Sequence, residues 1–248
     1  MLHELPPRTD ITVRVDLSRG EAALYEALRA EALADLEAAD GASTWRMKVF
    51  AHLTRLRLAV CNPRLVEGAP TLDSAKLAAF AGLVEDLRAG GHRALVFSQF
   101  VRHLDLVREW LDDQGVSYQY LDGKTSTAGR ERAVAAFQAG EGDLFLISLR
   151  AGGTGLNLTA ADYVLHLDPW WNPAVEDQAS DRAHRIGQTR PVTVYRLVAA
   201  NTIEEAIVDL HAKKRALADS ILDGAEAASA LTVDDMRALL AGTRPGSG

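Results

Sequence analysis

Short apolar runs alternate with helical segments from residue 93 onwards, and this alternation constrains the fold of the chain more than any other feature. The run Leu144–Ile147 is continuously apolar, which is typical of a strand buried on both faces. The remaining strands and the helices between them are predicted at Ala94–Phe97, Leu104–Leu111, Tyr118–Leu121, Gly129–Ala139, Tyr163–Leu167 and Val192–Val198. Strands that alternate with helices predict an α/β fold with a parallel sheet covered on both faces.

Helices are predicted at both ends of the chain. A strand at residues 8–17 is followed by helices from Ser18 to about Ala39, from Trp45 to Ala59 and from near Asp73 to Ala89. A capping signature at residues 201–204 opens a further helix, and a short one is predicted at residues 232–240. We therefore expect three parts, which are residues 1–72, 73–200 and 201–248.

Composition restricts the class of protein. The chain has 248 residues, and no apolar run is long enough to cross a bilayer, so no membrane partner is expected. Cys61 is the single cysteine, which leaves no internal disulfide and no cysteine-based zinc site, and no metal site is predicted. The net charge of −7 is unfavourable for DNA binding by bulk electrostatics. No signal peptide is visible at Met1, so we expect a cytoplasmic, nucleoid-associated protein. Only five of the 27 basic residues are lysine, a bias that suggests the codons of a GC-rich, bacterial genome.

The densest group of candidate site residues lies between Ser148 and Gln188. A loop with Gly152, Gly153 and Gly155 follows the predicted strand at residues 144–147, and Asn172-Pro173 predicts the start of a helix that ends before Gly187. On such a helix Gln178, Arg182 and Arg185 fall within a stripe about 60° wide. This stripe lies beside an apolar one formed by Val175, Ala179, Ala183 and Ile186. Arginines in one line suit a clamp on phosphate, although a surface helix with two solvated arginines has the same spacing.

Two more candidate segments follow predicted strands. Ser98-Gln99 follows the strand at residues 94–97, and the turn Asp122–Thr125 follows the one at residues 118–121. Ligands of parallel sheets bind outside the carboxyl ends of the strands, where these segments meet the glycine loop. Gly123-Lys124-Thr125 is not the end of a phosphate-binding P-loop, because Tyr118 stands where that loop needs its first glycine. The turn instead suits contact with a nucleic-acid backbone.

The stretch from Ser148 to Gln188 resembles motifs V and VI of the Swi/Snf family of DNA-translocating ATPases, within helicase superfamily two. The matching residues are 151–159, 168–173 and 177–188, with small departures at Arg150 and Thr154. The resemblance extends over roughly residues 5–222 and implies a second, RecA-like motor lobe. It makes residues 1–72 the connection between two lobes with a helical protrusion, residues 73–200 the lobe itself, and residues 201–248 bracing helices and a tail.

The resemblance also implies a site and partners. ATP with Mg²⁺ is the expected cofactor, with Arg182 and Arg185 as catalytic arginine fingers and the nucleotide contacted by Gln178, Gly153, Gly155 and Asn157. The backbone of double-stranded DNA is expected to meet Ser98, Gln99, Lys124, Thr125, Ser148 and Arg150. The chain has no Walker A or DExH-like sequence, so the phosphate-binding loop and the magnesium ligands are expected on a missing first lobe. The chain alone is therefore expected to be an inactive half of a DNA-dependent ATPase, which remodels or displaces a protein on DNA.

Two other functions fit the same residues. One is the lobe of a helicase that unwinds RNA or DNA, although residues 170–173 and 185–188 favour the Swi/Snf family. The other is a non-catalytic nucleic-acid-binding module with a RecA-like fold, for which the paired arginines have no obvious use.

Overall fold

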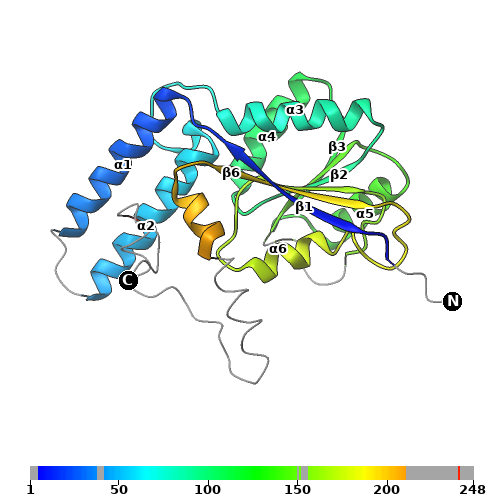
Figure 1. Cartoon of the computed structure of the whole chain (residues 1–248). Helices are drawn as coiled ribbons and strands as arrows, with labels where there is room; N and C mark the ends of the chain where they lie inside the picture. The colour runs from blue at the N-terminus through cyan, green and yellow to red at the C-terminus, as the bar shows by residue number, and fades with distance from the viewer. Residues whose placement is uncertain (1–4, 38–41, 150, 152–155, 211–239, 241–248) are drawn as a thin grey trace. The chain divides into compact units, whose positions relative to one another are not determined.

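The computed structural model describes residues 5–37, 42–149, 151, 156–210 and 240. The chain forms two compact units (Figure 1). The first, here called the sheet unit, comprises Met1–Arg14 and Lys76–Val198, and the second, the helical unit, comprises Val15–Ala75 and Ala199–Gly248. The division of the chain into residues 1–72, 73–200 and 201–248 stays a prediction.

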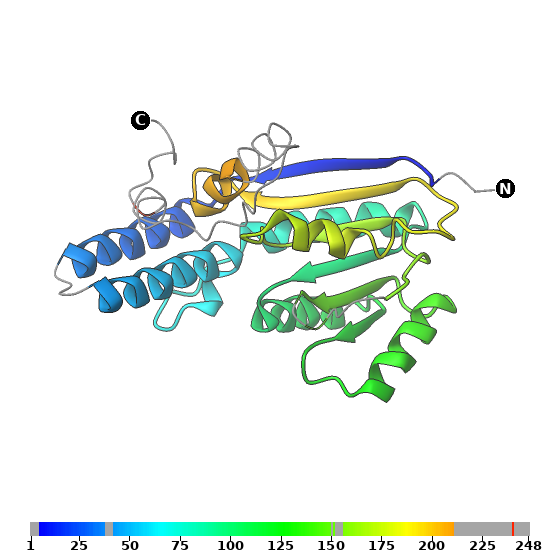
Figure 2. The ribbon, with the colours of Figure 1, turned by 90° about the horizontal axis from the view of Figure 1, so that it is seen from below.

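The sheet unit is built on six strands in the order β1-β6-β5-β2-β4-β3. Figure 2 shows β1 and β6 side by side at one edge. The strands are β1 Arg8–Val15, β2 Ala94–Ser98, β3 Tyr118–Leu121, β4 Leu144–Ser148, β5 Tyr163–His166 and β6 Val192–Ala199. The pairs β2/β4, β2/β5, β3/β4 and β5/β6 are parallel. The predicted RecA-like α/β sheet is thereby confirmed.

Alternate residues of each strand face opposite sides of the sheet, and helices cover both sides. Ala94 and Val96 of β2 pack in one core with helices α3 (Ala75–Ala89) and α4 (Val101–Asp113). Leu95 and Phe97 pack in the other with α5 (Thr127–Gln138) and residues 179 and 183 at and beyond the end of α6 (Pro173–Ser180). Burial on both sides explains why these strands are apolar throughout.

The helical unit contains α1 (Arg19–Glu37), α2 (Ala42–Cys61), the short 3-10 helix η1 (Pro63–Leu65) and a helical segment at residues 203–210. Ser18 caps α1 as predicted: its hydroxyl accepts from the Glu21 amide at 3.2 Å, and Glu21 accepts from the Ser18 amide at 2.9 Å. None of the helices that can be described in the structure combines the length and apolar character needed to cross a membrane.

Helices α1 and α2 run antiparallel, and their opposite charges pair. Asp35 accepts from Lys48 at 2.6 Å and lies 2.9 Å from the His52 ring, while Glu31 accepts from Arg55 at 2.7 Å. Hydrogen bonds from Lys48 and then His52 lower the pKa of Asp35. Helix α2 contains basic residues and no acidic ones, and acidic residues of α1 thus neutralise two cations of this basic run, Lys48 and Arg55.

Candidate functional site

Four strands of the sheet unit end at the same level, which brings the predicted site segments together. Ser98 at the end of β2 pairs with Ser148 at the end of β4, and both side chains are buried. Leu121 of β3 is in register with Ile147, and His166 of β5 with Phe97. The turn after β3 and the loop after β5 therefore begin beside Ser98 and Ser148. The predicted assembly of these segments at the carboxyl ends of the strands, here called the carboxyl edge, follows from this register.

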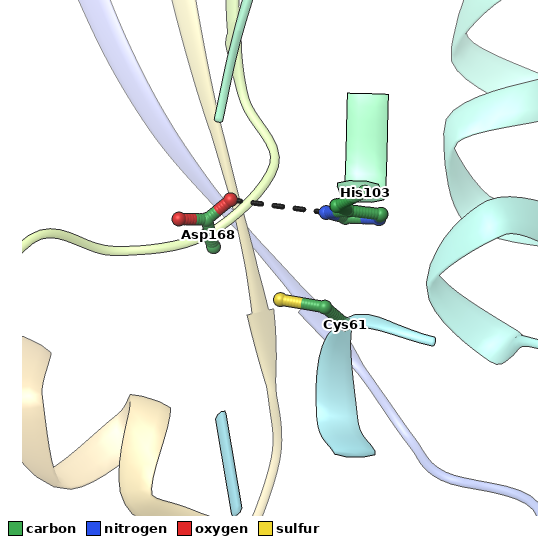
Figure 3. A group of neighbouring side chains, drawn as sticks. All are labelled: Cys61, His103 and Asp168. Atoms are coloured by element: carbon green, nitrogen blue, oxygen red, sulfur yellow. Dashed lines mark ion pairs between the residues drawn. The ribbon is translucent and has the colours of Figure 1, made fainter. Parts of the chain in front are cut away.

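Asp168, two residues beyond β5, is the buried centre of this edge. The Ser98 hydroxyl donates to its Oδ1, while the backbone amide and the Nε2 of Gln99 donate to its Oδ2 at 3.2 and 2.8 Å. His103 of α4 faces the same carboxylate, with its Nδ1 3.8 Å from Oδ1 (Figure 3). The side chains of Ser98 and Gln99 thus join the loop after β2 to the loop after β5. Asp168 had no predicted role beyond its place in the matching residues 168–173, although an acidic residue directly after an apolar strand is a usable signal.

The turn between β3 and α5 is shaped by Asp122. Its Oδ1 accepts from the Lys124 amide at 2.9 Å and from the Thr125 hydroxyl at 3.0 Å, and its Oδ2 accepts from the Tyr120 hydroxyl at 3.2 Å. Burial alone would raise the pKa of Asp122, but these hydrogen bonds together outweigh it and lower the pKa. Lys124 is exposed at the tip of the turn. The prediction that Tyr118 lies in a strand, which excluded a P-loop, is confirmed.

The helix predicted between residues 173 and 186 ends earlier than expected. Helix α6 stops at Ser180, and residues 181–187 form successive turns. The predicted stripe is therefore wrong, because Arg182 and Arg185 do not continue the helix that carries Gln178. Ile186, expected on the apolar side, is 80% exposed. Residues 181–187 are here called the arginine turn.

The two arginines of this turn have different surroundings. Arg182 is buried, and its guanidinium carbon lies 5.5 Å from the centroid of the Phe97 ring. Burial, with a smaller contribution from the charge of Arg130, lowers the pKa of Arg182 to about 10, so the side chain stays charged at neutral pH. Arg185 is exposed. Arg130, on α5, is a neighbour that sequence reasoning missed.

Helix α6 is held against the sheet by buried charges. Asn172 caps it as predicted, accepting from the Ala174 amide at 3.1 Å. Glu176 is fully buried, and it accepts from the Trp170 amide at 2.7 Å and from Nε of Arg196 on β6 at 2.9 Å. Burial is the largest influence on Glu176 and raises its pKa. Sequence reasoning missed both partners, because a glutamate on a short polar helix has no pattern that signals burial.

Of the other predicted site residues, some are exposed and some lie outside the described part of the chain. Gln178 and Asn157 are exposed, Gln178 on α6 and Asn157 on the segment that precedes β5. Gly153, Gly155 and Arg150 lie outside the described residues. The structure thus brings Ser98, Gln99 and Ser148 to one edge, and their proposed contacts stay predictions.

The chain is similar to known helicase-like ATPases. The family described as "Helicase conserved C-terminal domain" matches residues 75–187. The chain is 51% identical over 146 residues to "Chromatin-remodeling ATPase INO80" of Aspergillus oryzae, covering 58% of this chain and 10% of that protein. It is 36% identical over 230 residues to "Chromodomain-helicase-DNA-binding protein 1-like" of Danio rerio, covering 89% of this chain and 22% of that protein. The chain therefore spans under a quarter of these two relatives.

Solved structures share the fold. "Sulfolobus solfataricus SWI2/SNF2 ATPase core in complex with dsDNA" aligns with a TM-score of 0.75 and 30% identity, over 90% of this chain and 47% of that one. "Sulfolobus solfataricus SWI2/SNF2 ATPase C-terminal domain" aligns with a TM-score of 0.72 and 27% identity, over 88% of this chain and 91% of that one. The near-complete match to an isolated C-terminal domain identifies which part of such an ATPase this fold corresponds to.

The expected localisation, cytoplasmic and nucleoid-associated in a bacterium, is contradicted by the sequence relatives. Both are eukaryotic proteins, and they are named for chromatin remodelling or for a chromodomain. Chromatin is nuclear DNA with its proteins, so these relatives do not support a bacterial assignment. The bias from lysine towards arginine was a statement about codons and carried no information on the compartment.

Proposed function

The chain belongs to the Swi/Snf family of ATPases, of which it is a C-terminal helicase lobe, and we propose that it is one half of an ATP-dependent DNA translocase. The other half is a first RecA-like lobe with a phosphate-binding loop. ATP binds between the two lobes, and this lobe supplies positive charge to the transferred phosphoryl group. Cycles of closing and opening move the DNA contacts along one strand.

The observation that carries this proposal is the arginine turn. Arg182 is buried yet keeps a pKa of about 10, so its charge acts in surroundings with little water. A fixed charge in such surroundings stabilises a developing negative charge more strongly than it would in water. Arg185 lies in the same turn, beyond the end of α6, and is exposed. We assign both as arginine fingers, with Gln178, Asn157, Gly153 and Gly155 nearer the nucleotide.

The carboxyl edge does not fit Mg²⁺. Asp122 and Asp168 are the carboxylates that the structure describes there, and both accept hydrogen bonds on both oxygens. Oxygens that are already bound to N–H and O–H donors make poor ligands for a cation that demands octahedral oxygen coordination. We therefore assign the magnesium ligands to the first lobe.

The DNA contacts are assigned to the turn after β3 and to the strand ends beside it. Lys124 offers an exposed ammonium group, and Thr125 shares its hydroxyl with Asp122. Such groups contact phosphates without reading bases. Ser98, Gln99, Ser148 and Arg150 complete the assignment, and a solved relative in complex with double-stranded DNA supports that partner. A protein on the DNA is the expected object of remodelling.

The decisive experiment measures ATP hydrolysis, with and without double-stranded DNA, by this chain alone and by the chain joined to a Swi/Snf first lobe. We expect activity from the joined protein only. Arg182→Ala and Arg185→Ala are each expected to lower kcat by about 10³ or more, as is typical for arginine fingers. Arg190→Ala is the control, because Arg190 is 62% exposed and pairs with Asp162.

Each alternative has its own outcome. A kcat equal to that of the wild type in both Arg182→Ala and Arg185→Ala would contradict the assignment of arginine fingers. DNA binding without hydrolysis in the joined protein would indicate a binding module. Strand displacement on a forked duplex, in place of translocation that displaces a third strand, would indicate an unwinding helicase. Hydrolysis by this chain alone would show that it is not half of a site.

A further inference from the structure

We propose that Gln188 is a positioning residue that fixes Arg182 against the segment between the glycine loop and β5. The inference rests on the proposed function, in which Arg182 acts on ATP. Gln188 is the last residue of the sequence stretch around the arginine turn, and the function proposed above gives it no task. It does not touch the reacting atoms, so it acts through the turn.

Arg182 needs such a residue because α6 ends too early to hold it. Beyond Ser180 the chain turns through single hydrogen bonds, such as Ala183 N to Ser180 O at 3.1 Å and Gln188 N to Arg185 O at 2.9 Å. Gly187 has φ of 105°, a conformation that favours glycine, and it redirects the chain towards Gln188. Since no helix fixes this turn, its position must come from contacts with other segments.

Asp181 pairs with Arg8 at 3.1 Å and His184 lies 2.7 Å from the Pro6 carbonyl, and the side-chain amide of Gln188 makes the largest set of such contacts. It is buried, and the two hydrogens on its Nε2 are shared among the carbonyl oxygens of Thr159, Ala161 and Ala183, at 3.2, 2.8 and 3.0 Å. Its Oε1 accepts from the amides of Thr189 and Arg190 at 2.9 and 3.0 Å. One amide thus joins residues 159–161, the residue after Arg182, and the chain that leads into β6.

A backbone bond completes the link beside it. The Leu158 amide donates to the carbonyl oxygen of Arg182 at 2.9 Å. Leu158 follows Asn157, which we assign to the nucleotide. The Gln188 amide and the Leu158 amide therefore hold the backbone of Arg182 and that of the nucleotide segment at a fixed separation. Buried amides that are fully paired specify one arrangement, because breaking them leaves costly unpaired groups.

The test replaces Gln188 with methionine, which keeps the approximate volume and removes the amide. In the joined protein we expect kcat for DNA-stimulated hydrolysis to fall about 10²-fold, because a misplacement near 1 Å costs about that much. The KM for ATP is expected to change less than about twofold, since the phosphate-binding loop is on the first lobe. Gln119→Met is the matched control: it removes a side-chain amide that donates to the Glu141 carbonyl at 3.3 Å, on β3 at the opposite edge of the sheet.

A double-mutant cycle separates positioning from a general structural role. If Gln188 acts through Arg182, then Arg182→Ala should cost at least about tenfold less in the Gln188→Met background than in the wild type. Independent effects would multiply, and that result would overturn the inference, as would an unchanged kcat in Gln188→Met. If Gln188→Met does not fold, Gln188→Asn keeps the amide on a shorter side chain and is held to the same cycle.

The failure of the proposed function has a different signature. If Arg182→Ala alone leaves kcat unchanged, the finger assignment fails, and amide hydrogen exchange in this chain then tests Gln188. We expect Gln188→Met to speed exchange at Leu158, Thr189 and Arg190, and Gln119→Met to leave those amides unchanged. Unchanged exchange at Leu158 in Gln188→Met would overturn the positioning role itself.

Discussion

At the scale of single residues, His166 shows how burial selects a protonation state. Its Nε2 lies 2.9 Å from the Ser180 hydroxyl, which itself donates to the Glu176 carbonyl at 3.0 Å. The hydroxyl has one hydrogen, so we assign the His166 hydrogen to Nε2. The ring stacks on Phe97 at 5.5 Å between centroids, and burial lowers its pKa to about 3. His166 is therefore a neutral part of the core next to the arginine turn.

This pKa predicts that acid destabilises the fold. The unfolded histidine binds a proton as the pH falls through about 6.5, whereas the folded one does so only near 3. Stability is fully present above pH 6.5 and is lost as the pH falls, by roughly 2 kcal/mol at pH 5. Urea unfolding at pH 7.5 and pH 5 measures the loss, which should shrink in His166→Gln and persist in His184→Gln. An equal pH dependence in His166→Gln would contradict the assignment.

At the scale of elements, α6 is too short to be stable by itself and depends on the pair of Glu176 and Arg196. The same guanidinium also donates to Asp10 of β1 at 2.6 Å, so three elements meet at one charge. Isolated helices of this length are marginal in water, and tertiary contacts have to hold them. The start of the arginine turn is therefore fixed by two strands at the edge of the sheet.

Arg196→Met is expected to destabilise the sheet unit by about 3–5 kcal/mol, because it leaves Glu176 buried without its cation. The double variant Glu176→Gln with Arg196→Met should recover part of that loss, since it removes the uncompensated charge. Denaturant unfolding measures both. A single variant as stable as the wild type would mean that the pair contributes nothing to the anchoring of α6.

The sequence predicted elements well where local pattern decides them. The strands β2 to β6 lie within a residue or so of their predicted bounds, because short, mainly apolar or β-branched and aromatic runs between turn residues have few alternatives. The predicted length of the helix at residues 173–186 was wrong because long-range contacts, and not local pattern, decide where it ends. The apolar periodicity continues past Ser180, but hydrogen bonds from the Gln188 side chain and the Leu158 amide determine the backbone path there. These are contacts between segments that are distant in sequence, and periodicity does not reveal them. The position of Asp168 directly after an apolar strand was a usable signal, but the partners of Asp168 and Gln188 could not be predicted, since hydrogen-bond partners depend on the folded register.

At the scale of the whole molecule, net charge is a poor guide to DNA binding. The chain carries a net charge of −7, yet part of its basic run pairs with acidic residues of α1 within the helical unit. Paired charges partly cancel, so they attract DNA less than unpaired cations would. Contact with phosphate then depends on a few exposed cations such as Lys124.

Lys124→Ala is expected to weaken DNA binding by a similar factor on all sequences and to reduce the slope of log affinity against log salt by about 1. Lys48→Ala is the control, because Lys48 is paired with Asp35 at 2.6 Å. Fluorescence anisotropy with duplex DNA at several salt concentrations measures both slopes. Equal slopes in Lys124→Ala and the wild type would remove this lysine from the DNA interface.

The strand order has a consequence for biosynthesis. Of the six described strands β1 is the first in sequence, but its neighbour in the sheet is β6, which is the last of the six. At 5–20 residues per second, β1 waits roughly 10–40 s for that partner. During this interval the β-branched residues Ile11, Thr12 and Val13 are open to pairing with other nascent chains. The sheet therefore closes through a late, long-range pairing, and β1 stays open to other chains until β6 has been made.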